Sequence, residues 1–288
     1  MMIAIVGTTA SGKTDLALKL ASKYDGEIIC ADSRTIYRGM DIGTAKPTLA
    51  EQAAVPHHLL DVIEPGERLG AAEFKRLAEA AARDVLSRGR LPFLVGGSGM
   101  YVDAVLYDYK FPGGSDEKMR QKFEKLNDES LREMLAAEDP EAYGRVDLMN
   151  RRRVIRALET AGQPSSKRIE VRPDILVLGL TMNKEVIQKR IEQRVEKMLS
   201  EGFIQEVQTI GERYGWDCTA FEVIGYRAFK DVVFGRKTVA EATADFVSGD
   251  MALYKKQLTW FKRNKQIHWL TGDVEKAADA LIQTAASV

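Results

Sequence analysis

The feature that most constrains this chain is a short apolar run that leads into a loop bounded by glycines. The run Ile3–Val6 precedes Gly7-Thr8-Thr9-Ala10-Ser11-Gly12-Lys13-Thr14, which matches the pattern G-x-x-x-x-G-K-[ST], and a stretch of helical period follows over Thr14–Tyr24. The two glycines let backbone N–H groups curl around a phosphate, and the start of the helix adds partial positive charge. The sequence therefore predicts a strand, a phosphate-binding loop and a helix in direct succession.

The loop residues Gly7 to Thr14 are the candidate ligands of a diphosphate or triphosphate, and two of their side chains have distinct chemistry. Lys13 supplies a cation for the outer phosphate oxygens, and the hydroxyl of Thr14 suits a Mg²⁺ ligand. Such a loop binds a phosphate chain without defining the reaction, so other residues must identify the chemistry.

Apolar runs typical of buried parallel strands alternate with stretches of helical period. The predicted strands are Ile3–Val6, Ile28–Ala31, Leu59–Ile63, Phe93–Val95, Ile175–Leu180 and Ile267–Leu270. The predicted helices between and after them are Thr14–Tyr24, Ala71–Ser87, Asn183–Ser200 and Val239–Arg263. This alternation predicts an α/β fold with a parallel sheet and right-handed crossovers.

One segment breaks the alternation, because it contains helical patterns and no convincing strand. Its predicted helices are Asp116–Leu126, Glu129–Ala137 and Asn150–Ala161. The segment begins at Phe111-Pro112-Gly113-Gly114, and its helices end at Gln163-Pro164-Ser165-Ser166. We interpret residues 113–172 as a helical insertion domain within a core domain formed by residues 1–112 and 173–288.

Charge is balanced over the whole chain but segregated along it. There are 42 Lys and Arg and 42 Asp and Glu residues, so the net charge is 42 − 42 = 0, which argues against a general polyanion binder. Arg145–Arg172 contains 8 basic and 3 acidic residues, 8 − 3 = +5, and Met251–Trp269 contains 5 basic residues and no acid. Each patch is either a local polyanion site or a solvated helix face.

Several classes of protein are disfavoured. No apolar run reaches the ~20 residues that span a bilayer, and the start lacks the features of a signal peptide, so we expect a cytoplasmic protein that does not engage a membrane. Cys30 and Cys218 match no disulfide or zinc spacing. His57 and His58 would point to opposite faces of a strand, which favours structural roles over a metal site.

Polar residues follow two of the predicted strands. In an open α/β sheet, ligands bind outside the carboxyl ends of the strands, so Asp32 and Ser98 should lie beside the phosphate loop. Asp32 could instead serve as a helix cap. Asp61 falls within the predicted strand Leu59–Ile63, which disfavours it as an acid that holds a metal.

Several motifs, in order along the chain, resemble the tRNA dimethylallyltransferase family. These are Gly7–Thr14; Asp32-Ser33-Arg34-Thr35-Ile36-Tyr37-Arg38-Gly39-Met40-Asp41-Ile42-Gly43-Thr44-Ala45-Lys46-Pro47; Pro56-His57-His58-Leu59-Leu60-Asp61; Val95-Gly96-Gly97-Ser98-Gly99-Met100-Tyr101; Gly225-Tyr226-Arg227; and Gln257-Leu258-Thr259-Trp260-Phe261. The block from Met40 to Pro47 is highly specific. The chain is identified as a member of this family.

The resemblance implies both a reaction and an architecture. The enzyme would transfer a dimethylallyl group from dimethylallyl diphosphate to the exocyclic amine of the adenosine 3′-adjacent to the anticodon, in tRNAs that read codons starting with U, and release diphosphate. The fold would be a P-loop core similar to nucleotide kinases, and the helical insertion would help to grip the anticodon stem-loop of the tRNA. No obligate protein partner is expected.

The resemblance also implies roles for individual residues. Thr9–Thr14 would hold the isoprenoid diphosphate with Mg²⁺ on Thr14, and Lys13 and Arg227 would stabilise the departing diphosphate. Asp32 would be the general base, and the hydroxyl of Ser98 stands where the family usually has Thr. The residues implied to contact tRNA are Asp32, Ser33, Arg34, Thr35, Ser98, Arg120, Arg152, Arg153 and Arg156.

Some positions depart from the family pattern. Thr8 replaces a usual Pro, Thr35 replaces a frequent Gln, and Val223 replaces a Cys and is preceded by Glu222, where some relatives carry Arg. Two other readings of the phosphate loop are a small-molecule or nucleotide kinase that uses ATP and a non-catalytic, GTPase-like RNA-binding module. No Asn-Lys-x-Asp guanine motif occurs, which argues against the module.

Overall fold

The computed structural model describes residues 1–112, 117–163 and 165–286. The chain forms two compact units: a core unit of Met1–Leu106 and Val171–Val288, and an insertion unit of Tyr107–Glu170. The insertion unit therefore begins a few residues before position 113 and ends before position 172. Gly113, Gly114 and Pro164, which belong to the predicted entry and exit segments, lie outside the described residues.

The core unit contains a six-stranded parallel sheet in the order β3-β2-β4-β1-β5-β6. Its strands are β1 (Met2–Gly7), β2 (Gly26–Cys30), β3 (His57–His58), β4 (Leu91–Gly96), β5 (Ile175–Leu180) and β6 (His268–Trp269). Strand β1 pairs with β4 on one side, where Ile5 opposes Val95, and with β5 on the other, where Ile5 opposes Leu178. The predicted α/β class with a parallel sheet is confirmed.

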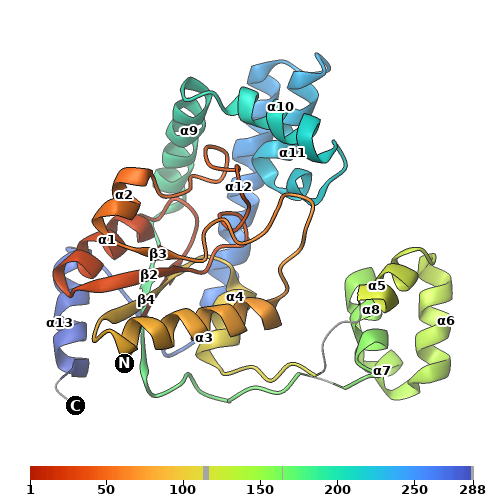
Figure 1. The fold of residues 1–288 in the computed structure, drawn as a ribbon, viewed down its shortest axis with the longest axis horizontal. Coiled ribbons are helices and arrows are strands. Elements are labelled where there is room, and N and C mark those ends of the chain that lie inside the picture. Colours follow the sequence, from red (N-terminus) through yellow and green to blue (C-terminus); the bar gives the residue numbers. More distant parts are fainter. Residues whose placement is uncertain (113–116, 164, 287–288) are drawn as a thin grey trace. The chain divides into compact units, whose positions relative to one another are not determined.

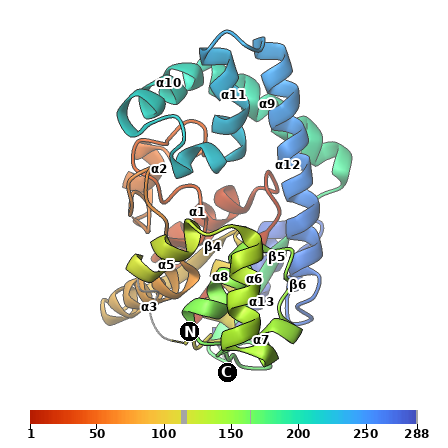
Figure 2. The ribbon, with the colours of Figure 1, turned by 90° about the vertical axis from the view of Figure 1, so that its right-hand side faces the viewer.

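Helices cover both faces of this sheet and form a separate group beyond it (Figures 1 and 2). They are α1 (Lys13–Lys23), α2 (Leu49–Ala54), α3 (Ala71–Ser87), α4 (Gly99–Leu106), α9 (Lys184–Ser200), α10 (Phe203–Tyr214), α11 (Ile224–Val233), α12 (Val239–Phe261) and α13 (Val274–Ala286), with a 3₁₀ turn, η1, at Thr219–Glu222. Helices α1 and α13 share an apolar cluster with one face of the sheet. Helices α3 and α4 contact each other, and α3 packs on β2 and β4.

Helices α9 to α12 have a hydrophobic core of their own. Four aromatic rings pack mainly edge to face at its centre, with Phe203 in contact with Tyr226, Phe229 and Phe246. Such contacts add about 0.5–1.5 kcal/mol to the burial of each pair. Helices α10, α11 and α13 were not among the predicted helices; α10 and α11 each contain a glycine, at Gly211 and Gly225, which weakens a helical pattern.

The two long predicted helices of this group begin at side-chain caps. The Asn183 carboxamide accepts a hydrogen bond from Val186 N at the start of α9. Thr238 and Glu241 form a reciprocal capping box at the start of α12. Each cap satisfies backbone N–H groups that the first turn of a helix leaves without partners, which is why the predicted starts agree with the structure.

The prediction of a strand at Leu59–Ile63 is wrong. The strand is instead the short pair His57–His58, and the chain leaves the sheet at once. Leu59 and Asp61 have φ angles of 64° and 53°, in the left-handed region, which an extended strand cannot contain. Asp61 is therefore not in the middle of a strand, and its carboxylate is turned to another partner, described below.

The described residues of the insertion unit form four helices: α5 (Glu117–Glu124), α6 (Asp128–Glu138), α7 (Pro140–Arg145) and α8 (Arg151–Glu159). Leu131 and Leu135 of α6 pack against Val154 and Leu158 of α8 in a small apolar cluster. The prediction for this segment did not include α7. Asp116, the first residue of a predicted helix, lies outside the described residues.

No helix in the described part of the chain is both long enough and apolar enough to cross a membrane.

A buried carboxylate ties together three segments at the beginning of β2. The Glu27 side chain is 1% exposed and accepts hydrogen bonds from Arg88, Arg90 and His58. Hydrogen bonds from Arg88 are the largest influence on the pKa of Glu27, which falls from 4.5 to about 2. The charged carboxylate is therefore the form that stabilises the fold.

We predict that Glu27→Gln lowers the free energy of unfolding at neutral pH by about 2 kcal/mol, because charge-assisted hydrogen bonds are removed. A carboxylate whose pKa is lower in the folded state stabilises above its unfolded pKa of 4.5 and stops doing so as the pH falls towards about 2. The difference between variant and wild type should therefore shrink over that range, as measured by urea unfolding at several pH values. Glu73→Gln, which removes an exposed ion pair with Arg76, is the control and should cost under about 0.5 kcal/mol. If the loss of unfolding free energy in Glu27→Gln did not depend on pH, the charged carboxylate of Glu27 would not be the stabilising form.

Candidate active site

Two close backbone approaches define the carboxyl edge of the sheet. A Cβ atom added at Gly7, the last residue of β1, would lie 2.0 Å from the carbonyl oxygen of Leu180 in β5. One added at Gly96, the last residue of β4, would lie 1.9 Å from the carbonyl oxygen of Ala31. Only glycine fits at either position, so the segments that leave these strands start side by side.

The phosphate loop connects β1 to α1 and is held from both sides. The Lys13 ammonium donates to the carbonyl oxygen of Thr8 at 2.5 Å, which folds the side chain back over the loop. The backbone N–H of Thr9 donates to Gln257 Oε1 at 2.7 Å, and Gln257 Nε2 donates to the carbonyl oxygen of Gly97 at 3.0 Å. Gln257 of α12 therefore joins the phosphate loop to the turn after β4.

A cavity of about 560 Å³ opens at this edge of the sheet. Its lining contains the phosphate-loop residues Thr9 to Thr14, the carboxylate Asp32, and side chains from α9 and α12. Residues from other segments also line it, among them Arg34 and Thr35; Asp41 to Thr48; His57; and Val223 to Gly225. A phosphate-binding loop and a carboxylate thus share one cavity within the core unit.

The Asp32 carboxylate is oriented by its own backbone. Asp32 Oδ1 accepts a hydrogen bond from Arg34 N at 2.8 Å, an Asx turn directly after β2. The next residue, Ser33, donates its N–H to Ser98 Oγ at 2.8 Å, and the two serine hydroxyls lie 3.1 Å apart. Ser98 does not line the cavity itself, but it fixes the turn that carries Asp32.

The electrostatics of the cavity centre on Lys13. Burial of its side chain lowers the pKa of Lys13 from 10.5 to about 8; the charge of Asp32 opposes this shift, and that of Arg194 adds to it. A buried ammonium gains stability from any anion placed beside it. The loop is therefore ready for an anionic ligand, because its cation is incompletely neutralised by the protein.

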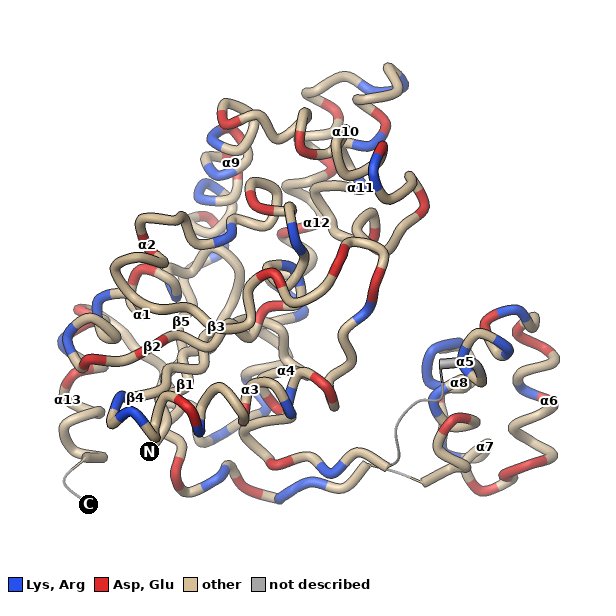
Figure 3. The backbone as a smooth tube through the Cα atoms, viewed as in Figure 1, with Lys and Arg blue, Asp and Glu red and all other residues tan. Residues whose placement is uncertain are grey.

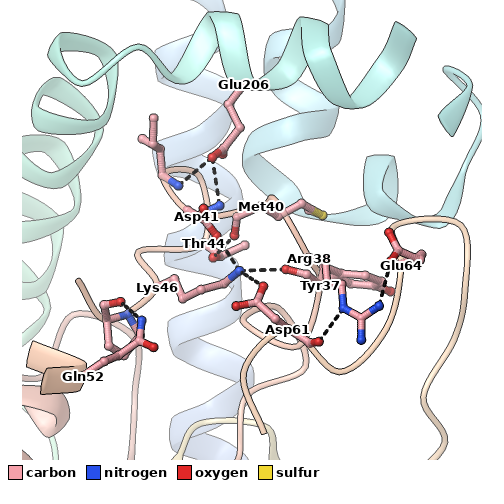
Figure 4. Close-up of polar contacts among 12 residues, drawn as sticks. Tyr37, Arg38, Met40, Asp41, Thr44, Lys46, Gln52, Asp61, Glu64 and Glu206 are labelled. Carbon is pink, nitrogen blue, oxygen red and sulfur yellow. Dashed lines mark hydrogen bonds and ion pairs between the residues drawn. The ribbon is translucent and has the colours of Figure 1, made fainter. Parts of the chain in front are cut away.

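The segment from Asp41 to Thr48 forms a wall of the cavity and is fixed by carboxylates (Figure 4). Glu206 of α10 accepts hydrogen bonds from the backbone N–H groups of Asp41, Ile42 and Gly43 at 2.8, 2.8 and 2.9 Å, and also from the Tyr226 hydroxyl. Burial is the main reason that the pKa of Tyr226 is raised, so its hydroxyl remains a donor. Glu206 thereby attaches this wall to the group of helices α9 to α12.

Lys46 fixes the far end of the same segment. Its side chain is 3% exposed, and its ammonium donates to Asp41 Oδ1 and Asp61 Oδ1 at 2.5 Å each and to the Tyr37 carbonyl oxygen at 2.8 Å. The Asp61 carboxylate, which is not in a strand, therefore points toward the Lys46 ammonium (Figure 4). All three ammonium hydrogens can be used in these bonds, which makes burial of this cation tolerable.

Some buried hydroxyls beside the cavity have no hydrogen-bond partner among the described residues. Ser11 Oγ and Thr35 Oγ1 belong to residues that are 1% and 7% exposed, and both residues line the cavity. Buried polar groups normally find a partner. These two hydroxyls therefore indicate where a bound ligand would be recognised.

The structure brings some of the sequence-predicted site residues together and leaves others apart. Asp32, Arg34 and Thr35 share the cavity with Thr9 to Thr14, whereas the lining does not include Gly7, Thr8, Ser33 and Ser98. Arg227 lies on α11, is exposed and is not part of the cavity lining. Arg120, Arg152, Arg153 and Arg156 belong to the insertion unit.

Within the insertion unit, the predicted arginines have unequal surroundings. Arg120 and Arg156 both pair with Glu159, whose side chain is 1% exposed, and Arg156 also donates to the Pro112 carbonyl oxygen. Arg152 and Arg153 are exposed on α8. The Arg153 guanidinium lies 3.6 Å from Asp147. The exposed pair is thus better suited to bind a partner than the pair on Glu159.

Sequence reasoning missed the contribution of α9 and α12 to the cavity. Arg190, Arg194 and Lys197 line it from α9, and Asp250 lines it from α12. On an amphipathic helix, charged residues at such spacing are usually solvent-exposed, so the pattern did not single them out. The only available signal was the repeat of arginines four residues apart, which places both on one face.

Comparisons with known proteins give one consistent family. The family model described as IPP transferase matches residues 35–264. The tRNA dimethylallyltransferase of Geobacillus thermodenitrificans is 42% identical over 96% of this chain and 92% of that protein. The crystal structure of the full-length tRNA isopentenylpyrophosphate transferase from Bacillus halodurans is 37% identical, with a TM-score of 0.73 over 99% of this chain and 95% of that one.

A structure with lower sequence identity has the same fold. A eukaryotic dimethylallyltransferase acting on tRNA superposes with a TM-score of 0.84 over 98% of this chain and 79% of that one, at 23% identity. The predicted family resemblance is confirmed. The chain belongs to the IPP transferase family, together with the curated tRNA dimethylallyltransferases that match it over nearly its whole length.

Proposed function

We propose that this protein is a tRNA dimethylallyltransferase: it transfers a dimethylallyl group from dimethylallyl diphosphate to the exocyclic amine of the adenosine 3′-adjacent to the anticodon, in tRNAs that read codons starting with U. The observation that carries the proposal is the shared cavity, in which the phosphate loop and the Asp32 carboxylate lie together. The names of the relatives and of the tRNA-acting structural neighbour support the acceptor.

The proposed reaction assigns each group a task. The amine nitrogen attacks the first carbon of the dimethylallyl group, the bond from that carbon to the diphosphate oxygen breaks, and its electron pair leaves with the diphosphate. The amine proton passes to Asp32, which its Asx turn holds in place as a general base. The loop N–H groups and Lys13 stabilise the negative charge that grows on the leaving diphosphate.

The segment after β2 would recognise the acceptor adenosine. Thr35 offers a buried hydroxyl with no partner among the described residues. A stacked base is reachable only after extrusion, which costs a few kcal/mol and is offset by stacking and backbone contacts. Arg34 and Thr35 line the cavity beside Asp32 and would contact the extruded adenosine.

The donor groups present fit a Mg²⁺ ion that arrives with the diphosphate. Among the described residues, no group of three or more His, Cys, Asp or Glu side chains could hold a metal ion. Mg²⁺ commonly takes few protein oxygens and completes its shell with phosphate oxygens and water, so the Thr14 hydroxyl in the cavity lining suits it. When bound, Mg²⁺ would neutralise part of the diphosphate charge.

The function is tested with an anticodon stem-loop RNA, dimethylallyl diphosphate and Mg²⁺, with ATP as the control donor. We expect prenylated RNA and released diphosphate with the first donor and no product with ATP. Phosphoryl transfer from ATP, with no prenyl transfer, would instead support the kinase reading. Binding of RNA without turnover of either donor would support the non-catalytic module.

We predict that Asp32→Asn folds normally and that its turnover falls by roughly 10²- to 10⁴-fold, the usual contribution of a general base. The carboxamide oxygen can still accept the hydrogen bond from Arg34 N, so the turn is retained while the base is removed. Single-turnover rates at saturating RNA and donor are the measurement. Asp25→Asn, at an exposed carboxylate before β2, is the control. Wild-type turnover in Asp32→Asn would show that Asp32 is not the base.

A second prediction concerns pH. Because the pKa of Lys13 is about 8, the ammonium is deprotonated in the ligand-free protein above that pH, whereas a bound diphosphate favours its protonated form. The dissociation constant for pyrophosphate should therefore rise with pH above about 8, by up to about tenfold per pH unit, with proton uptake on binding. Calorimetry in buffers of different ionisation enthalpy measures both quantities. Lys13→Arg stays charged at every pH used, so its pH dependence reports the contribution of pyrophosphate's own titration alone. Equal pH dependence in both proteins would refute the prediction.

The third prediction is that tRNA binding depends on salt through α8. Replacing the exposed pair, Arg152→Gln with Arg153→Gln, should lower the slope of log K against log[salt] by about 0.7–0.9 for each RNA phosphate that the variant no longer neutralises. Pyrophosphate affinity should not change. Arg156→Gln should in addition destabilise the insertion unit, because the buried Glu159 is deprived of a partner. Arg236→Gln, exposed on the core unit, is the control. If the slope were unchanged in the double variant, we would conclude that the RNA phosphates contact the basic segment Met251–Trp269 instead.

A further inference from the structure

Two extended segments of the insertion unit, residues 107–112 and 165–170, lead into its helices and out of them. They run antiparallel and are joined by backbone hydrogen bonds. Lys110 N donates to the carbonyl oxygen of Ser166 at 2.7 Å, and Ser166 N donates to that of Lys110 at 3.1 Å. The two segments therefore lie side by side as a short two-stranded ribbon, and side chains of both can share one of its faces.

The first segment of this ribbon carries an aromatic residue at every second position: Tyr107, Tyr109 and Phe111. Successive side chains of an extended chain point to opposite faces, so residues two apart share a face. The rings of Tyr109 and Phe111 are stacked, with their centroids 5.6 Å apart and their planes 25° from parallel. Both residues are half-buried, so part of this pair of rings remains exposed.

The stacked pair lies outside the hydrophobic core that joins the helices of its unit. Of the described residues, those that form the apolar cluster around α6 and α8 include neither Tyr109 nor Phe111. The pair thus offers apolar ring surface at the edge of the unit. A ligand with a flat ring of its own could cover that surface, because aromatic rings prefer stacked or edge-to-face partners.

The second segment brings positive charge to the rings. The Lys167 ammonium lies 4.6 Å from the centroid of the Tyr107 ring and 5.2 Å from that of Tyr109. Lys167 and Arg168 are both exposed, and neither forms an ion pair within the described part of the chain. Figure 3 shows Lys and Arg residues along this pair of segments. The ribbon therefore combines stacked rings with cations that are available to an anion.

We propose that Tyr109 and Phe111 form a stacking surface for an unpaired base of the RNA substrate, and that Lys167 binds a neighbouring phosphate. The inference rests on the proposed function, for which it adds an RNA contact in the insertion unit. Unpaired bases of RNA stack on aromatic side chains, while cations beside the rings bind the backbone phosphates. Stacking uses the flat face that every base has, so this contact adds affinity without selecting a sequence.

The probe is an anticodon stem-loop RNA, and its affinity is measured over a range of salt concentrations. Phe111→Leu keeps an apolar side chain but removes the flat ring, so we expect affinity to fall by about 5- to 100-fold, with an unchanged slope of log K against log[salt]. Lys167→Gln should instead make that slope shallower by about 0.7, the value for one phosphate of a single strand. Wild-type affinity in Phe111→Leu would overturn the proposal.

The matched control is Tyr143→Leu, which removes an aromatic ring that is 37% exposed on α7 of the same unit. We expect RNA affinity and salt slope close to those of the wild type, because this ring has no stacked partner or lysine beside it among the described contacts. An equal loss of affinity in Tyr143→Leu and Phe111→Leu would overturn the assignment of the stacking surface to the ribbon.

A second measurement separates stacking from stability. The fluorescent base 2-aminopurine is placed at one loop position at a time, and its emission falls when it stacks on a ring. We expect at least one position with lower emission in complexes of the wild type and of Phe111→Trp, which keeps a flat ring, than in the complex of Phe111→Leu. If Phe111 only supported the fold, Phe111→Leu would unfold at lower temperature while the folded protein bound RNA with wild-type affinity and emission. That result would also overturn the proposal.

The two levels of inference fail separately. RNA affinity requires no prenyl donor, so weaker binding in Phe111→Leu, together with no transfer by the wild-type enzyme, would reject the proposed function and keep the stacking surface. Normal transfer by the wild type, with unchanged RNA affinity and emission in Phe111→Leu, would reject the stacking surface and keep the function. If that variant altered only self-association in sedimentation, the rings would be a contact between copies of the chain, which would equally overturn the proposal.

Discussion

The close approach of backbones at the carboxyl edge of the sheet determines where the rest of the site can lie. Gly7 meets the Leu180 carbonyl of β5, and Gly96 meets the Ala31 carbonyl after β2, with no room for a side chain at either glycine. The phosphate loop, the Asp32 turn and the Ser98 turn consequently leave the sheet from adjacent points. The phosphate loop and Asp32 can therefore share a single cavity without long excursions of the chain, and Gln257 joins the phosphate loop to the turn after β4.

The sequence was sufficient to predict the elements whose signals are local. The phosphate loop, the parallel strands and the long helices α9 and α12 follow from glycine positions, apolar runs and helical periodicity. The prediction of a strand at Leu59–Ile63 was wrong because an apolar pattern does not reveal the backbone φ angles of its residues. Two left-handed residues turn the chain there, and Asp61 forms an ion pair with the buried Lys46 that no local pattern predicts.

The site was predictable only where a motif marked it. Asp32 and the loop could be named from their place after strands, but Arg190, Arg194 and Asp250 lie on helices whose orientation depends on long-range packing around Phe203. The charge segregation along the chain also needed the structure for its interpretation. Within the basic stretch of the insertion unit, Arg156 is engaged by the buried Glu159, whereas Arg153 stays at the surface. Net charge per segment could not distinguish a cation that pairs with a buried carboxylate from one that is exposed at the surface.

The chain contains two loops built to receive an anion, and it fills one of them itself. Three successive N–H groups at Asp41, Ile42 and Gly43 converge on Glu206, much as the N–H groups of a phosphate loop converge on a phosphate. Both loops border the same cavity. A phosphate entering this space meets one cradle already occupied by a tethered carboxylate and is left with the other. Because Glu206 already accepts hydrogen bonds from these three N–H groups, this loop is closed to a phosphate while the carboxylate stays in place.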